Sequence, residues 1–262
     1  MSASAAARPT RAVLIGAGGR MGRAILGAAG EFPALRFVGA IAAPESTLIG
    51  GDAGVLCGAP PGELLITGDL TAVLARAEVV IDFSHAEATR AHLNACRAAG
   101  KALLLGTTGY PSALEAEFAA AAREIALLVA PNTSLGVTLL LELAGRAAAA
   151  LPGFALRILE THHRDKRDAP SGTALALAAA LRAARSPGAQ GAQIPIESRR
   201  EGEVIGEHTV LLSGPGEELF LGHRAQERAI FARGALAAAL WLAPQPPGRY
   251  AMRDLLAGKT GT

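Results

Sequence analysis

The chain has 262 residues, of which 50% are hydrophobic and 18% charged, and its 25 basic and 23 acidic residues give a net charge of +2. This composition excludes a disordered chain, which needs low hydrophobicity and high net charge. The near-balance of charge gives no indication of a nucleic-acid partner. At about 150 residues per domain, the length predicts one or two domains.

Cysteine spacing and hydropathy argue against a disulfide-stabilised, metal-binding or membrane-spanning chain. Cys57 and Cys96 fit no disulfide framework and no zinc pattern, which indicates two buried apolar residues in a reducing compartment. Residues 1–7 lack the basic start of a targeting segment. The uncharged run Ile125–Leu141 approaches the length of a membrane span, but Pro-Asn-Thr-Ser-Leu-Gly at 131–136 would break a spanning helix. We therefore expect a cytoplasmic protein with no membrane partner and no metal.

Over the first 130 residues, strand and helix patterns alternate. Ala12–Ile15 is a continuous apolar run that ends at a glycine, as expected for a strand buried on both faces. The same pattern predicts strands at Phe37–Ile41, Leu64–Ile66, Val79–Ile81, Ala102–Leu105 and Ala126–Val129. Helices are expected between them at Met21–Ala29, Leu70–Ala75, Ala86–Ala99 and Ser112–Ala122. This alternation predicts right-handed βαβ units and a doubly wound, Rossmann-type parallel sheet.

After Asn132 the pattern changes. Helices are expected at Gly136–Ala150, from Ser171–Thr173 to about Arg185, and at Gln226–Leu242. Strands are expected at Ala155–Glu160, Glu203–Gly206, His208–Leu212 and Glu218–Leu221, and loops at His162–Asp168 and Ser186–Gln193. Consecutive strands without helices between them predict a second, α+β domain with an open mixed sheet. We expect the first domain to comprise residues 1–133 and 229–262, and the second residues 134–228.

A glycine-rich segment, Gly16–Gly22, follows the first strand and opens the first helix. There, unpaired N–H groups and the helix dipole attract a dinucleotide pyrophosphate, and glycines allow close approach of the backbone. The segment fits GxxGxxG through Gly16, Gly19 and Gly22, because Met21 occupies the third glycine position of GxGxxG. The alternative is a tight turn that only packs the helix against the strand. Its place in the first βαβ unit favours dinucleotide binding.

The end of the second predicted strand leaves the choice of dinucleotide open. An acidic residue there usually holds the adenosine ribose, whereas this chain has Ala42, Ala43 and Pro44. Glu45 follows in the loop, where a solvated carboxylate is an equally good interpretation. Since neither an NAD-type carboxylate nor an NADP-type arginine is present, both NADH and NADPH remain candidates.

Residues 160–174 carry two histidines and three basic residues directly after a strand, followed by Ser-Gly-Thr at a helix start. Cations and a helix N-terminus suit a small dianion, such as a dicarboxylate. His162 and Lys166, four positions apart, are candidate proton donors. The alternative is a solvated basic loop followed by Ser171 as a helix N-cap. The dinucleotide-binding pattern elsewhere in the chain favours the functional interpretation.

The segment Glu-x-His-His-x-x-Lys-x-Asp-Ala-Pro-Ser-Gly-Thr-Ala at 160–174 resembles the characteristic motif of the 4-hydroxy-tetrahydrodipicolinate reductase (dihydrodipicolinate reductase) family. Further segments in the family's order are Gly16–Gly22, Ile81–Ser84, Gly106–Gly109, Asn132–Val137, Gly206–Thr209 and Met252–Asp254. The resemblance covers nearly the whole chain. It implies a bacterial enzyme of diaminopimelate and lysine biosynthesis, in which NAD(P)H delivers hydride to C4 of the substrate ring and the hydroxyl leaves as water.

The resemblance also implies roles by matching position. His162 and Lys166 would be the acid/base pair, with Lys166 the preferred proton donor. The dicarboxylate substrate would be bound by His163, Ser171, Gly172 and Thr173. The dinucleotide would be contacted by Gly16, Ala17, Gly18, Gly19, Arg20, Met21, Gly106, Thr107, Thr108, Ala130, Pro131, Asn132 and Thr133. The first domain would thus bind NADH or NADPH, and the second would bind substrate and join its sheets into a homotetramer.

The chain departs from the family at two positions. Ala43-Pro44 stands where members often carry an acidic-basic pair, which affects recognition of the adenosine ribose, and Thr133 stands where a Phe is common. Two alternative functions remain. Another two-domain NAD(P)-dependent dehydrogenase would leave the His-His…Ser-Gly-Thr motif unexplained. A non-catalytic dinucleotide-binding sensor would have no need of His162 and Lys166 as proton donors.

Overall fold

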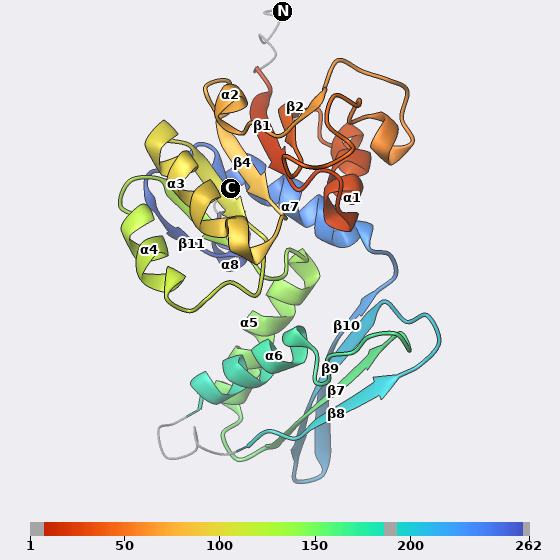
Figure 1. Ribbon diagram of the computed structural model, residues 1–262. Coiled ribbons are helices and arrows are strands. Elements are labelled where there is room, and N and C mark those ends of the chain that lie inside the picture. Colours follow the sequence, from red (N-terminus) through yellow and green to blue (C-terminus); the bar gives the residue numbers. More distant parts are fainter. Residues whose placement is uncertain (1–7, 186–192, 259–262) are drawn as a thin grey trace, which may run out of the picture. The chain divides into compact units, whose positions relative to one another are not determined.

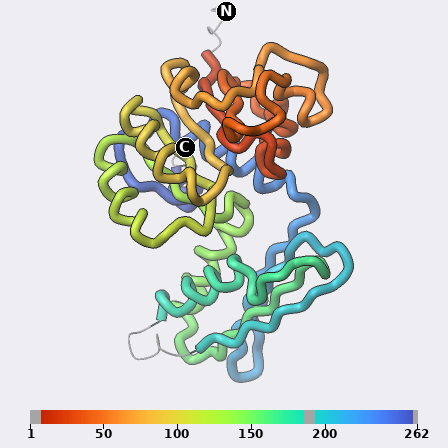
Figure 2. Tube along the Cα trace, in the orientation of Figure 1, coloured from red at the N-terminus to blue at the C-terminus, as the bar shows by residue number. Residues whose placement is uncertain are grey.

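The computed structural model describes residues 8–185 and 193–258 (Figure 1). The chain forms two compact units, one from residues up to Thr133 and from Phe231 onward, the other from Ser134 to Ile230. The path through both units can be followed in Figure 2. The loop expected at Ser186–Gln193 lies, except for Gln193, outside the described residues. None of the described helices is long and apolar enough to cross a membrane.

The first unit contains a seven-stranded parallel sheet in the order β11-β6-β5-β4-β1-β2-β3. Its strands are β1 (Thr10–Ile15), β2 (Leu35–Ile41), β3 (Ile66–Thr67), β4 (Val79–Asp82), β5 (Ala102–Leu105), β6 (Ala126–Val129) and β11 (Gly248–Tyr250). The strand order reverses at the pair β1–β4, the topological switch point at which doubly wound sheets bind ligands. The predicted Rossmann-type sheet is confirmed.

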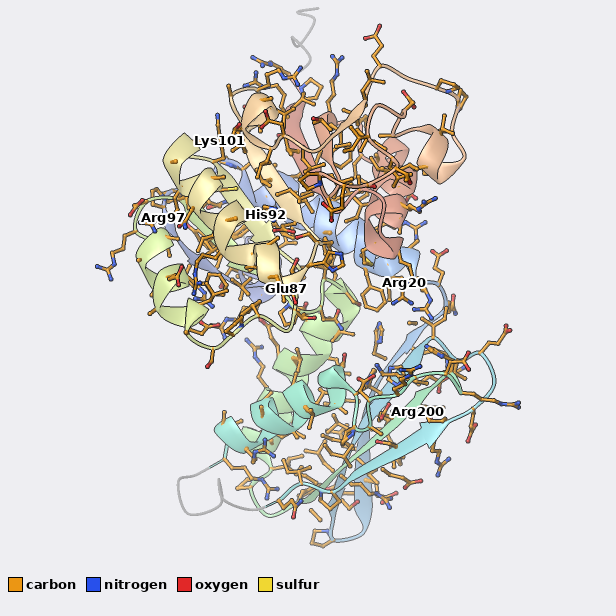
Figure 3. All side chains as sticks on the ribbon, in the orientation of Figure 1. Arg20, Glu87, His92, Arg97, Lys101 and Arg200 are labelled. Carbon is orange, nitrogen blue, oxygen red and sulfur yellow. The ribbon has the colours of Figure 1, made fainter. Side chains whose placement is uncertain are left out.

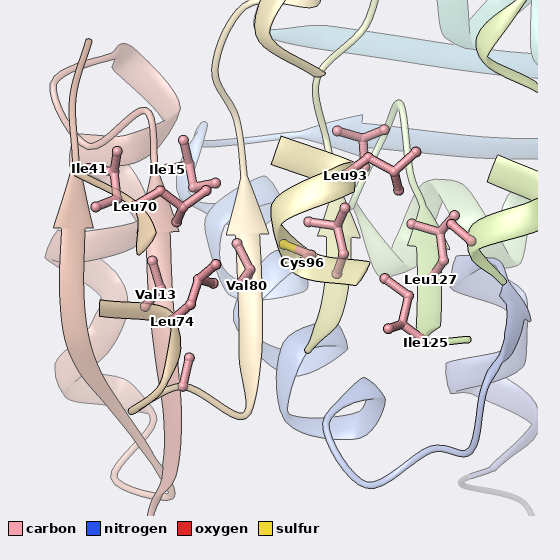
Figure 4. Packing of buried hydrophobic residues seen from close by; sticks show 14 of the residues in the cluster. Val13, Ile15, Ile41, Leu70, Leu74, Val80, Leu93, Cys96, Ile125 and Leu127 are labelled. Carbon is pink, nitrogen blue, oxygen red and sulfur yellow. The ribbon is translucent and has the colours of Figure 1, made fainter. Parts of the chain in front are cut away.

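Helices enclose this sheet because its central strands are apolar on both faces. They are α1 (Arg20–Ala28), α2 (Thr71–Leu74), α3 (Thr89–Ala99), α4 (Leu114–Ala121), α7 (Ala229–Leu242) and α8 (Met252–Ala257), with short 3-10 turns at Ala29–Glu31, Val55–Cys57 and Ala86–Ala88. Val13, Val80 and Leu127 pack with α2, α3 and α4 in one core cluster (Figure 4). The alternating residues Leu14 and Ile81 are also fully buried, so both faces of the sheet are covered, as parallel sheets require.

The second unit is a four-stranded mixed sheet with two helices. The sheet order is β10-β9-β7-β8, with β7 and β8 parallel and the other pairs antiparallel. The elements are α5 (Leu135–Ala150), β7 (Ala155–His162), α6 (Gly172–Ala183), β8 (Ile196–Arg200), β9 (Gly206–Gly214) and β10 (Glu217–Ala225). Leu156, Ile158 and Val210 pack with both helices in a second core cluster. The predicted α+β domain with a mixed sheet is confirmed.

Along β7, alternation places two polar side chains on the core-facing side. Leu156 and Ile158 belong to the core, and with a period of two residues Glu160 and His162 follow on the same side. Both are buried, at 1% and 8% exposure. The strand therefore carries the first part of the predicted charged segment into the interior, where polar groups require partners.

Several sequence predictions need correction. The strand expected at Glu203–Gly206 is wrong: the chain turns there, with Gly202 at φ +49°, and β9 begins only at Gly206. Leu65 is 59% exposed, and β3 begins after it at Ile66. Among the described strands and α-helices, the sequence patterns also missed β8, β11 and α8. Cys57 is only partly buried, whereas Cys96 lies in the core.

We predict that Phe118→Ala destabilises the first unit by about 3–5 kcal/mol, because Phe118 is fully buried and its ring meets that of Tyr110 edge-to-face at 5.0 Å. Urea unfolding followed by circular dichroism measures the change. Leu65→Ala, at a 59% exposed position of the same unit, is the control and should change stability by less than about 0.5 kcal/mol. Equal effects of the two substitutions would contradict this assignment of the core.

Candidate active site

The glycine loop between β1 and α1 is built by close backbone contacts. Gly16 has φ +84°, and a Cβ there would lie 2.4 Å from the carbonyl oxygen of Phe83. A Cβ on Gly22 would lie 2.1 Å from the carbonyl oxygen of Gly16. The N-cap residue of α1, Gly19, has no side chain to bond the first N–H groups of the helix. The close backbone contacts fit the packing interpretation. The N–H groups at the start of α1 fit the binding interpretation, because they can hold a phosphate.

The other predicted dinucleotide contacts follow neighbouring strands of the same sheet. Gly106–Thr108 comes directly after β5, and Ala130–Thr133 after β6, so both segments lie at the carboxyl edge, where the glycine loop also starts. Arg20 begins α1 and is exposed (Figure 3). The fold therefore brings all thirteen predicted cofactor residues to one edge of the first sheet: Gly16, Ala17, Gly18, Gly19, Arg20, Met21, Gly106, Thr107, Thr108, Ala130, Pro131, Asn132 and Thr133.

A buried carboxylate organises this edge, and sequence reasoning missed it. Asp82, at the end of β4, is fully buried and lies 2.8 Å from Nδ1 of His92 on α3. Its other oxygen accepts the N–H of Ser84 at 2.9 Å and the hydroxyl of Thr107 at 3.2 Å. These contacts hold the turns after β4 and β5 together. Only the position of Asp82 at a strand end, within the Ile81–Ser84 segment, hinted at it in the sequence.

Thr133, at the family's frequent Phe position, has a structural partner. Its side chain is 2% exposed, and its hydroxyl donates to the carbonyl oxygen of Phe231 at 2.7 Å. Thr133 is the last residue of the first stretch of this unit, and Phe231 is the first residue of its second stretch. The hydroxyl therefore ties together the two chain segments that connect the units.

In the second unit, Glu160 is the centre of a buried hydrogen-bond network. Its Oε2 is bonded to Nδ1 of His162, and its Oε1 accepts from Arg200 at 3.0 Å and from the N–H of Ser171 at 3.2 Å. Burial alone would raise the pKa of Glu160, but hydrogen bonds from Arg200, Ser198 and His162 outweigh burial and hold it below its ordinary value. Glu160 is therefore an ionised, buried acceptor.

This ionised carboxylate determines the tautomer of His162. A carboxylate only accepts hydrogen bonds, so Nδ1 of His162 must carry the proton that it donates to Glu160. In the neutral imidazole, Nε2 is then the nitrogen that can take up a proton. Burial, and then the positive charges of Lys166 and Arg200, lower the pKa of His162 and exceed the opposing effect of Glu160. His162 is thus oriented and held toward its neutral form.

The predicted substrate residues follow in the loop and at the start of α6. Nζ of Lys166 lies 2.8 Å from Asp168, and this ion pair lowers the pKa of the Asp168 carboxyl. Ser171 is the N-cap of α6: its hydroxyl accepts the N–H of Ala174 at 3.2 Å. The same hydroxyl lies 3.0 Å from Nε2 of His208. Ser171 therefore caps α6, as the alternative interpretation of this segment predicted.

The remaining predicted residues are accessible at the same place. His163 and Thr173 are partly buried, and Gly172, the first residue of α6, is exposed. The structure thus brings His162 and the α6 start to one buried carboxylate, and Lys166 lies close enough to lower the pKa of His162. Sequence reasoning missed Arg200 and His208 as members of the network, because they come from β8 and β9 and meet Glu160 only through the sheet.

Glu160, His162 and His208 also have the geometry of a metal site, with one ligand atom of each lying within 4.8 Å of the others. Their chemistry does not fit a metal. Glu160 already accepts from the Arg200 guanidinium, from His162 and from a backbone N–H. A divalent cation would have to displace this guanidinium and approach the charge of Lys166. The donor set fits a hydrogen-bond network.

A Rossmann-type unit with a glycine loop at its carboxyl edge, joined to a mixed-sheet unit with a buried histidine–carboxylate pair, defines the class of two-domain dinucleotide-dependent oxidoreductases. Family models described as the N-terminus and the C-terminus of dihydrodipicolinate reductase match residues 10–133 and 136–256. The chain belongs to the dihydrodipicolinate reductase family.

Similar proteins agree with this assignment. The chain is 45% identical to the 4-hydroxy-tetrahydrodipicolinate reductase of Alkalilimnicola ehrlichii, covering 94% of this chain and 98% of that protein. It is 43% identical to the enzyme of the same name from Anaeromyxobacter dehalogenans strain 2CP-1, with 96% and 99% covered. Its fold is similar to that of a dipicolinate-bound dihydrodipicolinate reductase from Paenisporosarcina sp. TG-14, with a TM-score of 0.78, 23% identity, and 93% and 97% of the chains covered.

We predict that His208 makes the fold sensitive to acid. Burial is the main cause that lowers its pKa from 6.5 to about 4. The unfolded chain therefore binds more protons than the folded one between these pH values, so the free energy of unfolding falls as the pH drops from 6.5 toward 4. The loss should reach about 3 kcal/mol. His208→Gln, which cannot take up a proton, should flatten this part of the pH profile in urea-unfolding experiments; an equally steep profile would contradict the assignment.

Proposed function

We propose that the protein is an NAD(P)H-dependent 4-hydroxy-tetrahydrodipicolinate reductase, which forms tetrahydrodipicolinate with loss of water in diaminopimelate and lysine biosynthesis. The single observation that carries this proposal is the buried Glu160–His162 pair beside the Lys166 loop and the α6 N-terminus. It supplies an oriented imidazole, cations and helix N–H groups in one place, in a chain whose curated relatives are named for this reaction.

The first unit would hold the cofactor. The glycine loop and the α1 N-terminus would bind the pyrophosphate, and the turns after β5 and β6 would contact the remainder of the dinucleotide. When bound, the nicotinamide supplies a hydride. The Asp82 network holds the turn at Thr107 through hydrogen bonds within the unit.

The second unit would hold the dicarboxylate substrate. The N–H groups at Gly172 and Thr173 and the Thr173 hydroxyl would bind one carboxylate at the positive end of the α6 dipole. His163 and Lys166 would add positive charge. Support comes from the Paenisporosarcina relative, which was solved with dipicolinate bound. Ser171 would support this site by holding the start of α6, because its hydroxyl already caps the helix and pairs with His208.

Proton delivery would come from the second unit as well. Hydride addition to C4 of the unsaturated ring moves negative charge into the ring, and an acid must neutralise that charge. We assign this proton to Lys166. His162 is the rival donor, since it is held in one tautomer by Glu160. Its lowered pKa leaves less of the protonated form at neutral pH, which favours Lys166.

We further propose a homotetramer that forms through the outer face of the second sheet. Phe220 on β10 is 60% exposed and pairs in register with Leu211 on β9. Both alternate with residues that point toward the helices, so they lie on the opposite face of the sheet. Leu211 is buried, and the exposed ring of Phe220 on this face supports its use as an association surface. A cytoplasmic location agrees with a biosynthetic reductase that uses a nicotinamide cofactor.

The proposed function is tested by mixing the protein with freshly prepared 4-hydroxy-tetrahydrodipicolinate and following the loss of nicotinamide absorbance. Turnover with formation of tetrahydrodipicolinate is the expected result. Dinucleotide binding without turnover would contradict the proposal and indicate a sensor. Turnover of amino acids or sugars in place of this substrate would indicate another two-domain dehydrogenase.

We predict that NADH and NADPH both support turnover, with a preference within about 30-fold, or about 2 kcal/mol. The reason is that Ala43-Pro44 provides neither a carboxylate that repels the 2′-phosphate nor a guanidinium that binds it. Values of kcat/KM for the two cofactors measure the preference. A preference above about a thousandfold would overturn this prediction.

Thr173→Val should raise the substrate KM and leave cofactor affinity unchanged. The change keeps the shape of the side chain but removes a hydroxyl that would donate a charge-assisted hydrogen bond, worth about 1.5–3 kcal/mol. Steady-state kinetics and cofactor titration measure the two effects. An equal loss of cofactor affinity would indicate a damaged helix start, and no change in either quantity would show that Thr173 does not bind the substrate.

Lys166→Arg should lower kcat by about 10²-fold or more while the substrate KM changes much less. Arginine keeps the positive charge beside Asp168 but is a far weaker acid. Lys166→Ala would remove charge and proton together and cannot separate the two roles. If kcat is kept in Lys166→Arg and abolished in His162→Gln, the proton comes from His162 and the assignment to Lys166 is wrong.

A further inference from the structure

Arg200 connects the histidine–carboxylate pair to the loop that follows it. It is the last residue of β8 and stands next to His162 in the register of the sheet. Its side chain is 20% exposed (labelled in Figure 3). Its Nη2 donates to Oε1 of Glu160 at 3.0 Å and to the carbonyl oxygen of Asp168 at 2.6 Å, and its Nε donates to the carbonyl oxygen of Lys166 at 3.3 Å.

These acceptors belong to two different parts of the site. Glu160 orients His162 from within β7. The carbonyl groups of Lys166 and Asp168 belong to the loop between β7 and α6, whose far end is held by the bond from Ser171 N–H to the same Glu160 carboxylate. One planar guanidinium therefore spans the buried carboxylate and the middle of the loop. The fourth contact, from Nη1 to the carbonyl oxygen of Arg199, steadies the guanidinium on its own strand.

We propose that Arg200 is a positioning residue of the reductase reaction: its guanidinium holds the Glu160–His162 pair and the Lys166-bearing loop in one fixed arrangement. This inference rests on the proposed function, since it gives the arrangement a chemical purpose. Arg200 acts through its neighbours. A misplacement of an acid by about 1 Å costs roughly 10²-fold in rate.

The shape of the guanidinium matters in addition to its charge. A lysine at this position keeps a positive charge near Glu160, but a single ammonium cannot reproduce the fork that reaches the carboxylate and two carbonyl groups together. Arg200→Lys therefore separates two roles. If Arg200 only neutralises the buried carboxylate, lysine restores function; if it positions the loop, lysine does not.

The test compares Arg200→Lys and Arg200→Ala with the wild-type protein and with Arg199→Ala. Arg199 is the matched control, because it precedes Arg200 on β8 but pairs with the exposed Glu197. The first measurement is steady-state kinetics with both substrates. We expect kcat to fall about 10²-fold in Arg200→Lys and at least as far in Arg200→Ala. The KM for the dinucleotide should stay within about twofold of the wild-type value, and Arg199→Ala should match the wild type.

The second measurement is amide hydrogen exchange of the loop, which does not depend on activity. The N–H groups of Arg164 and Lys166 are bonded to the carbonyl groups of Gly202 and His163. Their exchange should be at least about tenfold faster in both Arg200 variants than in the wild type and Arg199→Ala, while α5 keeps its protection. Arg200→Lys keeps the charge beside Glu160, so it provides a folded comparison if Arg200→Ala does not fold.

These two measurements separate the positioning role of Arg200 from the proposed reductase function. Wild-type kcat in Arg200→Lys, or loop exchange that is unchanged in both Arg200 variants, overturns the positioning role. An equal loss of kcat in Arg199→Ala overturns it as well, because the effect would then be general to β8. A wild-type protein without turnover contradicts the proposed function alone, since the exchange measurement still shows whether Arg200 holds the loop.

Discussion

The second unit depends on burying one charge, the carboxylate of Glu160. An isolated buried carboxylate costs several kcal/mol, and only good hydrogen bonds offset that cost. Here the bonds come from His162 on the same strand, Arg200 on the next strand, and the backbone of Ser171 at the start of α6. Each partner that stabilises the charge is thereby fixed in place, so the need to satisfy Glu160 also builds the candidate active site.

The first unit depends on a different constraint, the close approach of the α1 backbone to the backbone of the glycine loop. Gly22 brings α1 against the loop so closely that a Cβ would overlap the carbonyl oxygen of Gly16. The α1 N-terminus lacks a side-chain cap at Gly19, and its N–H groups favour a pyrophosphate. The first unit thus shapes its glycine loop through absent side chains, and the second shapes the surroundings of Glu160 through a network of charged ones.

The sequence predicted most strands of the first sheet and the glycine loop, because their patterns are local. Apolar runs such as Ala12–Ile15 and the glycine spacing need no knowledge of distant residues. The failures have physical reasons. β8 (Ile196–Arg200) is a charged strand without an apolar alternation, and Val204-Ile205 resembles a strand although β9 begins only after it, at Gly206. The bond between Arg200 and Glu160 joins residues 40 positions apart, so it follows only from the parallel register of β7 and β8.

Glu160 is ionised inside the fold, and its charge orders the site. Infrared difference spectroscopy between the wild-type protein and Glu160→Gln tests the ionisation state of Glu160 directly. At pH 6 to 8 the account predicts that the substitution removes a carboxylate band and no protonated carboxyl band, since hydrogen bonds hold the pKa of Glu160 below its ordinary value. Loss of a protonated carboxyl band in this range would contradict the account, because a neutral Glu160 could not fix the tautomer of His162 or attract Arg200.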